Sequence, residues 1–322
     1  MRYEKRMSKI KRNFLFIKSA IIEFLSKLKT IIFMDKKQLF YLILDNQNKF
    51  DYELAIAVIV KNEADYILEW IEYHRLIGFS KFYIYDNDST DDIHDVLKGY
   101  VEEGIVTLQT IHGHAKQLDA YNHAIKQAKS ETRWLMILDA DEFVQNLTNI
   151  NLGELIGNNH VGMLIGWMIF GSSGQTRKKD GLVIERFTHR ADNKFISDYK
   201  IILNPRKILR FKNPHYAQMI GKIVDENGKV IHSYPYHTSQ QAIPAPRRLV
   251  RINHYYTKSL EEFREKSERG YADSDSTLTI RKERSLEDFN EHDRNEVEDL
   301  SMEKFVPKIC EQIQKYKKFN QL

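Results

Sequence analysis

The segment WLMILDADEF, residues 134–143, decides the fold that we expect for this chain. Its five leading apolar residues are typical of a strand buried on both faces, and the strand ends in Asp139 and Asp141, one small residue apart. Burying an unpaired carboxylate is costly, so acids just beyond a buried strand usually meet solvent, a cation or a ligand. Divalent cations such as Mg²⁺ or Mn²⁺ suit such a pair and commonly bridge to substrate phosphates. The alternative is an ordinary polar junction between strand and loop.

Two earlier strands end in the same way. Residues 55–60 are apolar and run into the polar segment 61–63, and residues 82–85 run into the acid-rich loop 86–91. Apolar residues at three- and four-residue spacing follow each loop and predict a helix. His74 lies on the apolar face of the first of these helices, where we expect a core histidine rather than a ligand.

Alternating strands and helices predict an α/β fold with a mostly parallel sheet, in which ligands bind beyond the carboxyl ends of the strands. A further strand at 106–110 and a helix from about 119 to 129 precede the quoted segment. The loop between them carries His112 and His114, which suggest a metal pair, but no cysteine lies nearby and the carboxylates offer a better site. A loop that handles phosphate or sugar is therefore favoured.

Four segments in this order resemble glycosyltransferase family 92 and its bacterial relatives, which are similar to the larger family 2. They are VKNEADYILEWIEYHRLIGFSKFYIYDNDSTD (60–91), GHAKQLDAYNHAI (113–125), WLMILDADEF (134–143) and INHYYTKSLEEFREKSERG (252–270). The resemblance covers about residues 52–270 and implies a GT-A fold, that is, a Rossmann-like, mostly parallel central sheet flanked by helices. It also implies inverting transfer of a hexose, with galactose favoured, from a UDP-sugar. Mn²⁺ or Mg²⁺ would be held by the Asp-x-Asp motif and the diphosphate. The expected acceptor is a cell-surface glycan or its lipid-linked precursor.

The resemblance also assigns roles to individual residues. Asp141 is expected as a direct metal ligand, Asp139 as a ligand that also faces the ribose or donor sugar, and His254 of the Asn-His-Tyr motif as a third ligand. The remaining positions expected to bind the donor nucleotide sugar are Asn62, Glu63, Asp86, Gln117 and Asn122.

Inversion needs a base that takes the proton of the acceptor hydroxyl. Glu185 is the first acid in an apolar surround after the Gly-rich loop 171–174, so we expect it to be the catalytic base, with Asp198 and Asp225 as rivals. An exposed glutamate paired with arginine is the structural alternative. Four later basic residues are compatible either with phosphate or acceptor contacts or with surface charge, namely Lys200, Arg206, His215 and His237.

Composition limits the possibilities. A chain of 322 residues that is 42% hydrophobic can bury one large α/β core with small appendages. The net charge of +4 is modest and its basic residues are not interleaved with aromatics, which argues against a nucleic-acid partner. Cys310 is the only cysteine, so no intrachain disulfide can form and a reducing, cytoplasmic location is expected. We divide the chain into an N-terminal extension (1–50), a catalytic domain (51–258) and a helical C-terminal extension (259–322).

The two ends differ from the middle. Residues 1–18 carry seven basic residues against one acid, and an apolar, helix-like stretch follows at 14–34. Four charges interrupt that stretch, so we expect an amphipathic rather than a spanning helix, and no signal peptide. Two placements stay open. The segment lies peripherally on an anionic membrane at the inner face of the cell, or its apolar face docks on the catalytic domain or a partner chain.

The C-terminal part predicts a helix from 259, a solvated turn at 290–299 and a final helix at 302–316. Asp273 and Asp275 follow no strand, so we expect them to face solvent.

Two other functions compete with glycosyl transfer. A nucleotidyltransferase uses a similar sheet and metal, but it is expected to carry a Gly- and Arg-rich phosphate loop after the first strand, and residues 61–63 contain no glycine. A non-catalytic glycan-binding or scaffold protein with a decayed site is the second, and the intact acidic and Asn-His-Tyr motifs argue against it.

Overall fold

The computed structural model describes residues 18, 20–43, 50–148, 150–157, 160–195, 198–213, 216–231, 246–268 and 284–320. The basic residues of segment 1–17, His215, His237, Asp273 and Asp275 lie outside the described residues.

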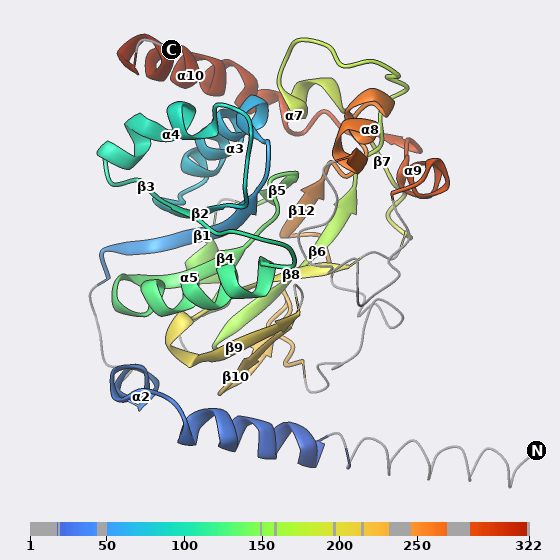
Figure 1. The fold of residues 1–322 in the computed structure, drawn as a ribbon. Coiled ribbons are helices and arrows are strands. Elements are labelled where there is room, and N and C mark those ends of the chain that lie inside the picture. Colours follow the sequence, from blue (N-terminus) through green and yellow to red (C-terminus); the bar gives the residue numbers. More distant parts are fainter. Residues whose placement is uncertain are drawn as a thin grey trace, which may run out of the picture.

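A curved nine-stranded sheet forms the centre of the part that is described (Figure 1). Its order is β3-β2-β1-β4-β8-β6-β12-β5, and β11 pairs with β6. β1 to β4 run parallel to one another, whereas β8 is antiparallel to both β4 and β6, and β5 is antiparallel to β12. The strands are β1 Tyr52–Val60, β2 Lys81–Asp86, β3 Val106–Thr110, β4 Thr132–Ile137, β5 Glu142–Asn146, β6 Gly162–Ile169, β8 Tyr199–Leu203, β11 Ile223–Val224 and β12 Val250–His254.

Helices cover both faces of this sheet. α3 (Ala64–Leu76), α4 (Ile93–Glu102) and α10 (Val306–Asn320) lie on one face, and α5 (Gln117–Glu131) lies on the other (Figure 1). β1 shows why two layers form, because Ile56 and Val58 join one apolar core while Ala55 and Ala57 join the other. The predicted α/β fold class, with its mostly parallel sheet flanked by helices, is confirmed.

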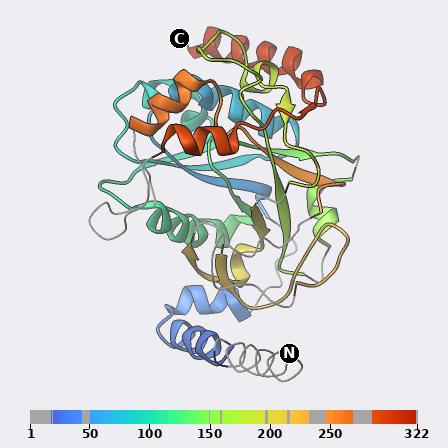
Figure 2. The ribbon, with the colours of Figure 1, turned by 90° about the vertical axis from the view of Figure 1, so that its right-hand side faces the viewer.

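Shorter elements complete the fold. They are α2 Lys36–Ile43, α6 Leu152–Ile156, α7 Val183–Arg186, β7 His189–Arg190, the 3₁₀ helix η1 Pro205–Lys207, β9 Ile208–Asn213, β10 Tyr216–Met219, α8 Leu260–Glu268, α9 Leu286–His292, β13 Val297–Glu298 and the 3₁₀ helix η2 Glu303–Phe305. The N-terminal helices and α10 lie at opposite ends of the molecule, as a second view also shows (Figure 2). Among the described residues no helix is both long and apolar enough to cross a membrane.

The acidic stretch 290–299 is not the solvated turn that we expected. Its strand β13 pairs with β7, and Asp299 receives Arg190 Nε at 2.6 Å and Arg251 Nη2 at 2.8 Å. Burial raises the pKa of Asp299, but the hydroxyl of Ser301 and the two guanidinium groups outweigh burial, so the pKa falls well below its usual value. The stretch therefore ties the C-terminal segment to the core.

The prediction for His74 is confirmed. Its side chain is fully buried, its Nδ1 lies 2.8 Å from the carbonyl oxygen of Trp70, and the N–H of Val144 donates to its Nε2 at 3.2 Å. The ring is thus a neutral core histidine that carries its proton on Nδ1.

Candidate functional site

The carboxylates of the decisive segment lie in a sharp turn between β4 and β5. The N–H of Asp139 donates to Glu142 Oε2 at 2.9 Å, and this bond closes the turn. The carbonyl oxygen of Asp141 accepts the N–H of Tyr255 at 2.9 Å. The turn therefore brings the carboxyl end of β4 against the end of β12, where His254 lies.

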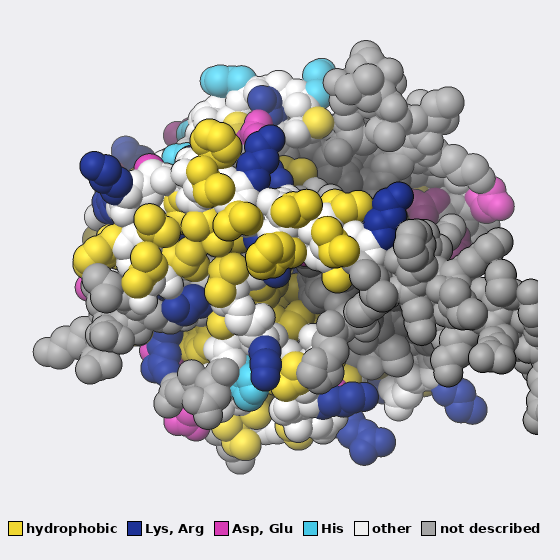
Figure 3. Space-filling view, turned by 90° about the horizontal axis from the view of Figure 1, so that it is seen from below, with side chains coloured by type: hydrophobic (Ala, Val, Ile, Leu, Met, Phe, Trp, Pro, Cys, Tyr) yellow, Lys and Arg dark blue, Asp and Glu magenta, His cyan; other side chains and the backbone are white. Residues whose placement is uncertain are grey.

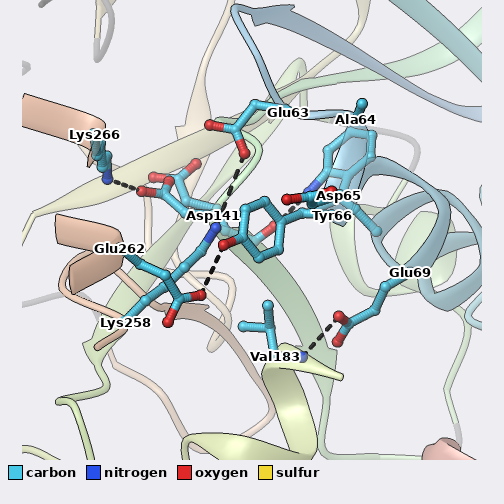
Figure 4. Close-up of polar contacts among 12 residues, drawn as sticks. Glu63, Ala64, Asp65, Tyr66, Glu69, Asp141, Val183, Lys258, Glu262 and Lys266 are labelled. Carbon is cyan, nitrogen blue, oxygen red and sulfur yellow. Dashed lines mark hydrogen bonds and ion pairs between the residues drawn. The ribbon is translucent and has the colours of Figure 1, made fainter. Parts of the chain in front are cut away.

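Asp141 is held between two cationic or basic groups, of which Lys266 is labelled beside it in Figure 4. His254 Nε2 is 3.5 Å from its Oδ1, and Lys266 of α8 contacts its Oδ2. Burial by itself raises the pKa of Asp141, but Lys266 and His254 outweigh that effect, so the pKa lies well below its usual range. Asp141 is therefore ionised at any working pH.

Asp139 has a separate set of partners. Lys200 of β8, which is almost inaccessible, places its Nζ 2.9 Å from Asp139 Oδ2 and 3.5 Å from Glu142 Oε2. The hydroxyl of Tyr121 donates to Asp139 Oδ1 at 3.3 Å. Burial opposes ionisation of Asp139, yet Lys200 keeps the pKa of Asp139 below its usual value. About a third of this side chain stays exposed, so it can still meet a ligand.

The third acid of the segment behaves differently. Glu142 is fully buried, and burial together with the charges of Asp139 and Asp141 raises its pKa well above the usual range despite Lys200. Lys200 responds in the opposite sense: burial lowers its pKa, but Asp139 and Glu142 outweigh burial and raise it overall. Lys200 thus stays protonated beside the acids.

A second group of residues links α3, α7 and α8 next to Asp141 (Figure 4). Lys258 Nζ lies 3.9 Å from Glu63 Oε2 and 3.2 Å from the centre of the Tyr66 ring. The hydroxyl of Tyr66 donates to Glu262 Oε1 at 2.7 Å, and Arg186 binds both carboxylate oxygens of Glu262. Burial lowers the pKa of Lys258, whereas Arg186 and two hydroxyl donors offset burial and lower the pKa of Glu262 to about 2.

A polar cleft of about 470 Å³ opens beside this group. Three parts of the chain surround it, namely the beginning of α3, the segment around Lys178 and α8. Its lining residues are Lys61, Asn62, Asp65, Tyr66, Lys178, Glu265 and Glu268. The cleft shares Tyr66 with the residue group and α8 with Lys266, so it gives a ligand access to this edge of the sheet.

Three predicted donor-binding residues meet at the edge where β1 and β2 end. Asn62, with φ of +54°, accepts the N–H of Thr90 at 2.7 Å through its side chain. Asp86 is buried and accepts the N–H of Ser89 at 3.0 Å, and its other oxygen is 2.8 Å from His94 Nε2. The loops after β1 and β2 are thus joined, and Asn62, Glu63 and Asp86 share one edge.

The two residues predicted on α5 have different partners. Gln117 donates to the hydroxyl of Tyr121 at 2.8 Å, and Tyr121 in turn donates to Asp139. The Oε1 of Gln117 is buried without a hydrogen-bond partner among the described residues. Asn122 instead accepts the N–H of Phe211 at 2.8 Å and donates to the carbonyl of Leu118 at 2.8 Å. The side-chain amide of Asn122 therefore ties α5 to β9. It makes no contact with Asp139 or Asp141 among the described hydrogen bonds.

Glu185 also lies apart from the acids Asp139, Asp141 and Glu142. It is exposed on α7 and accepts the N–H of Leu182 at 3.4 Å. The neighbouring Arg186, rather than Glu185, connects α7 to the site through Glu262.

The rivals of Glu185 have backbone roles. Asp198 accepts the N–H of Trp167 through its carbonyl at 2.9 Å. Asp225 accepts the N–H groups of Asn227 and Lys229 at 2.9 and 3.0 Å and so caps a turn.

Sequence reasoning gave no specific role to the lysines that hold the acids. Lys200 was expected only as a general basic residue, and Lys258 and Lys266 were not singled out. One signal was present, because Glu262 and Lys266 are four residues apart and share one face of α8. The sequence did not indicate which acid that face would meet.

The fit of a metal rests on two residues. Asp141 offers carboxylate oxygens and His254 an imidazole whose Nδ1 is buried without a hydrogen-bond partner in the described part of the chain. Among the described residues no group of three His, Cys, Asp or Glu side chains converges as a metal site. Asp141 and His254 therefore suit a cation that takes its other ligands from a bound diphosphate. Asp139, paired with Lys200, is less suited to direct ligation.

Residues 51–279 match the family model described as glycosyltransferase family 92. A family 92 protein of Ricinus communis is 25% identical over 222 residues, which cover 67% of this chain and 37% of that protein. One of Oryza sativa subsp. japonica is 25% identical over 221 residues, covering 67% and 35%. This chain thus spans little more than a third of the length of these relatives.

Among solved structures, S. aureus TarS 1–349 in complex with UDP-GlcNAc is similar with a TM-score of 0.37 and 15% identity, covering 83% of this chain and 89% of that one.

Proposed function

The chain belongs to glycosyltransferase family 92, and from this premise we propose that it is a metal-dependent, inverting hexosyltransferase. The proposed donor is a UDP-sugar, with UDP-galactose favoured, and the proposed acceptor is a cell-surface glycan or its lipid-linked precursor. One observation carries the proposal. Asp139 and Asp141 lie at the carboxyl end of β4, beside His254 and at the sheet edge where the polar cleft opens, and each carboxylate is paired with a lysine.

We propose that Asp141 and His254 hold Mn²⁺ or Mg²⁺ together with the donor diphosphate. When bound, such an ion would stabilise the charge on the departing diphosphate. Lys258, whose ammonium lies between Glu63 and the Tyr66 ring, is placed to add positive charge on the α3 side of the site. A charge that is fixed before the reaction stabilises the transition state without reorganisation.

The donor sugar or ribose is proposed to meet Asp139. Lys200 and Tyr121 fix this carboxylate, and its exposed third leaves an oxygen able to accept a hydroxyl proton in a hydrogen bond. Gln117 supports the same position through Tyr121. Asn62, Glu63 and Asp86 are the proposed nucleoside side of the site, since they gather at the ends of β1 and β2.

Glu185 remains our proposed base. It is exposed, it follows the Gly-rich loop, and Arg186 links its helix to Glu262 and so to the site. A base in this position would remove the acceptor proton as the anomeric carbon is attacked. We further propose a cytoplasmic location, peripheral on the inner face of the membrane, which agrees with the single free cysteine, Cys310.

A donor screen tests the proposal. UDP-galactose, UDP-glucose and UDP-GlcNAc are each added with and without Mn²⁺, and donor hydrolysis and thermal stabilisation are measured. We expect one UDP-sugar to stabilise the protein and to be hydrolysed only when Mn²⁺ is present. Hydrolysis that is equally fast in a chelator would refute the metal requirement. A lack of response to every UDP-sugar would refute the donor class.

A further inference from the structure

The described N-terminal helices expose an unusual number of large apolar side chains. Of the sixteen large hydrophobic residues exposed in the described chain, nine lie between residues 21 and 43, so they form one surface rather than scattered positions. They are Ile21, Ile22, Phe24, Leu25, Leu28, Ile32, Phe33, Phe40 and Ile43. We call this set the apolar surface. Seen from below, it forms a continuous band with Lys and Arg side chains around it (Figure 3).

The polar face of helix 20–32 is turned toward the protein. Gln218 of β10, which is fully buried, donates to Glu23 Oε1 at 3.1 Å and to Ser26 Oγ at 3.3 Å. Lys212 of β9 lies 3.3 Å from Glu23 Oε2, and Thr30 donates to Gln218 Oε1 at 3.3 Å. We call these contacts the polar latch.

This orientation is the reverse of that in an ordinary surface helix, which buries its apolar stripe. The alternative in which the apolar face docks on the catalytic domain is therefore wrong for the described residues. The polar side chains along the helix form hydrogen bonds and an ion pair with β9 and β10. The side chains of the apolar surface remain exposed.

α2 continues the same surface. The ammonium of Lys207 donates to the carbonyl of Leu42 at 3.1 Å, which fixes the end of α2 to η1. Asp35 accepts the N–H of Gln38 at 2.9 Å and so begins α2 directly after the first helix. Phe40 and Ile43 stay exposed on it, at 55% and 68%. Both helices are thus held on the domain through polar contacts, while the large side chains of the apolar surface stay exposed.

Positive charge surrounds the apolar surface. Lys18, Lys29, Lys36 and Lys37 are exposed along the two helices against one exposed acid, Asp35, whereas Glu23 is turned into the polar latch. In sequence, residues 1–17 add six Lys or Arg against one Glu. A second copy of the chain would bring like charges together on such a face, whereas an anionic lipid surface offers both apolar depth and negative charge.

We propose that the apolar surface is a monotopic binding face for an anionic lipid bilayer. Its side chains enter the boundary between headgroups and acyl chains, the flanking lysines meet anionic headgroups, and the polar latch holds the catalytic domain in a fixed orientation above the membrane. This inference rests on the peripheral location proposed above and names the surface responsible for it, but it depends on neither the donor nor the metal.

Vesicle co-sedimentation of the full chain tests the proposal. Vesicles of phosphatidylcholine alone are compared with vesicles containing about a third phosphatidylglycerol, at low and high salt. We expect binding to the anionic vesicles that weakens several-fold as salt rises, and little binding to the neutral ones. Equal sedimentation with both compositions, or none with either, would overturn the proposal.

Point variants then locate the surface. Phe24→Glu combined with Ile32→Glu changes residues that are 65% and 66% exposed, so the fold should be retained, and we expect at least a tenfold loss of partitioning into anionic vesicles. The matched control is Phe319→Glu, which is 80% exposed at the far end of the molecule and should bind like the unchanged chain. Unchanged binding by the double variant would overturn the proposal.

Sedimentation velocity without lipid tests whether a second copy of the chain, rather than a lipid bilayer, covers the apolar surface. We expect a monomer at all concentrations tested. A concentration-dependent dimer that the double variant abolishes would identify a second copy as the occupant and overturn the lipid assignment. Donor hydrolysis is not part of either readout, so failure here is distinct from failure of the proposed enzyme activity.

Discussion

Asp141 meets an imidazole on one side and an ammonium on the other, and this single carboxylate concentrates the chemistry of the site. Its neighbour two residues earlier, Asp139, has Lys200 as its own counter-ion. The two acids of one motif are therefore electrostatically distinct. Asp141 faces groups that a divalent cation would displace or share, while Asp139 is fixed by a buried lysine.

Asp141→Asn is expected to abolish transfer. The change removes an anionic ligand from the proposed cation, and the loss of leaving-group stabilisation is on the order of several kcal/mol in the barrier. Donor hydrolysis at saturating Mn²⁺ measures the effect, and circular dichroism checks the fold. Asp119→Asn, whose side chain is 64% exposed, is the matched control. Near-normal turnover of the Asp141→Asn variant at low Mn²⁺ would show the ligand assignment to be wrong.

Lys266→Met is expected to strengthen Mn²⁺ binding in the absence of donor. The ammonium of Lys266 contacts the same carboxylate that would ligate the ion, so its removal frees Asp141. We expect a roughly tenfold lower Kd, which corresponds to about 1.4 kcal/mol.

The readout for this variant is the free Mn²⁺ signal in electron paramagnetic resonance. Lys315→Met, with a side chain that is 63% exposed, should leave the Kd unchanged. An unchanged or weaker affinity in Lys266→Met would mean that Lys266 does not compete with the ion.

Among the elements, α3 does most to position the site. Its first turn carries Tyr66, and side chains in its middle form hydrogen bonds with the backbone of β5, the strand that begins at Glu142. Trp70 Nε1 donates to the carbonyl of Glu142 at 2.8 Å, Tyr73 donates to the carbonyl of Val144 at 2.7 Å, and the N–H of Val144 donates to His74. The turn with Asp139 and Asp141 is thus held by a helix that lies far away in sequence.

Because His74 is one of these hydrogen-bonding side chains, the stability of the fold depends on pH. Burial lowers the pKa of His74 from about 6.5 to about 3, although the bond to Trp70 opposes the shift. Between these values the unfolded chain binds more protons, so stability rises with pH up to about 6.5 and is lost as pH falls. From pH 7 to pH 5 we expect His74 to account for a loss of about 2 kcal/mol in the free energy of unfolding.

Urea unfolding at pH 7, 6 and 5 measures this slope. His74→Gln should be less stable at pH 7, because it loses buried ring contacts, but its stability should fall less between pH 7 and 5. The exposed His114→Gln keeps the original slope. A His74→Gln variant with the full slope would assign the pH dependence to other groups.

At the scale of the whole molecule, the N-terminal helices and α10 differ in how they pack. The N-terminal helices turn apolar side chains outward, whereas α10 closes the core over α3 and α4. Tyr316 stacks on Tyr100 with ring centres 3.9 Å apart, its hydroxyl donates to the carbonyl of Val96 at 2.9 Å, and Ile309 is fully buried. The site lies between these ends, on the edge of the sheet (Figure 1).

Tyr316→Ala is expected to lower the free energy of unfolding by about 3 kcal/mol, since it empties a buried aromatic position and removes a hydrogen bond. Chemical denaturation measures the loss, with Phe319→Ala, 80% exposed, as the matched control. The KM for the donor should be unchanged, because α10 contributes no residue to the site described above. A loss below about 1 kcal/mol would mean that α10 is not part of the cooperative core.

The sequence by itself determined the strands of residues 55–60, 82–85, 106–110 and 134–138, the acidic loops that follow them and the buried state of His74. These features depend on local periodicity and on the rule that parallel strands end at one edge, both of which a single chain displays. Only the tertiary structure decided which lysine neutralises each acid.

Lys200 is 61 residues from Asp139 and Lys266 is 125 residues from Asp141, and no local pattern encodes a pairing across such distances. The structure likewise decided which way helix 20–32 faces. Periodicity reveals that a helix has an apolar and a polar side, but the direction of docking depends on what the rest of the fold offers. Here that is the buried amide of Gln218.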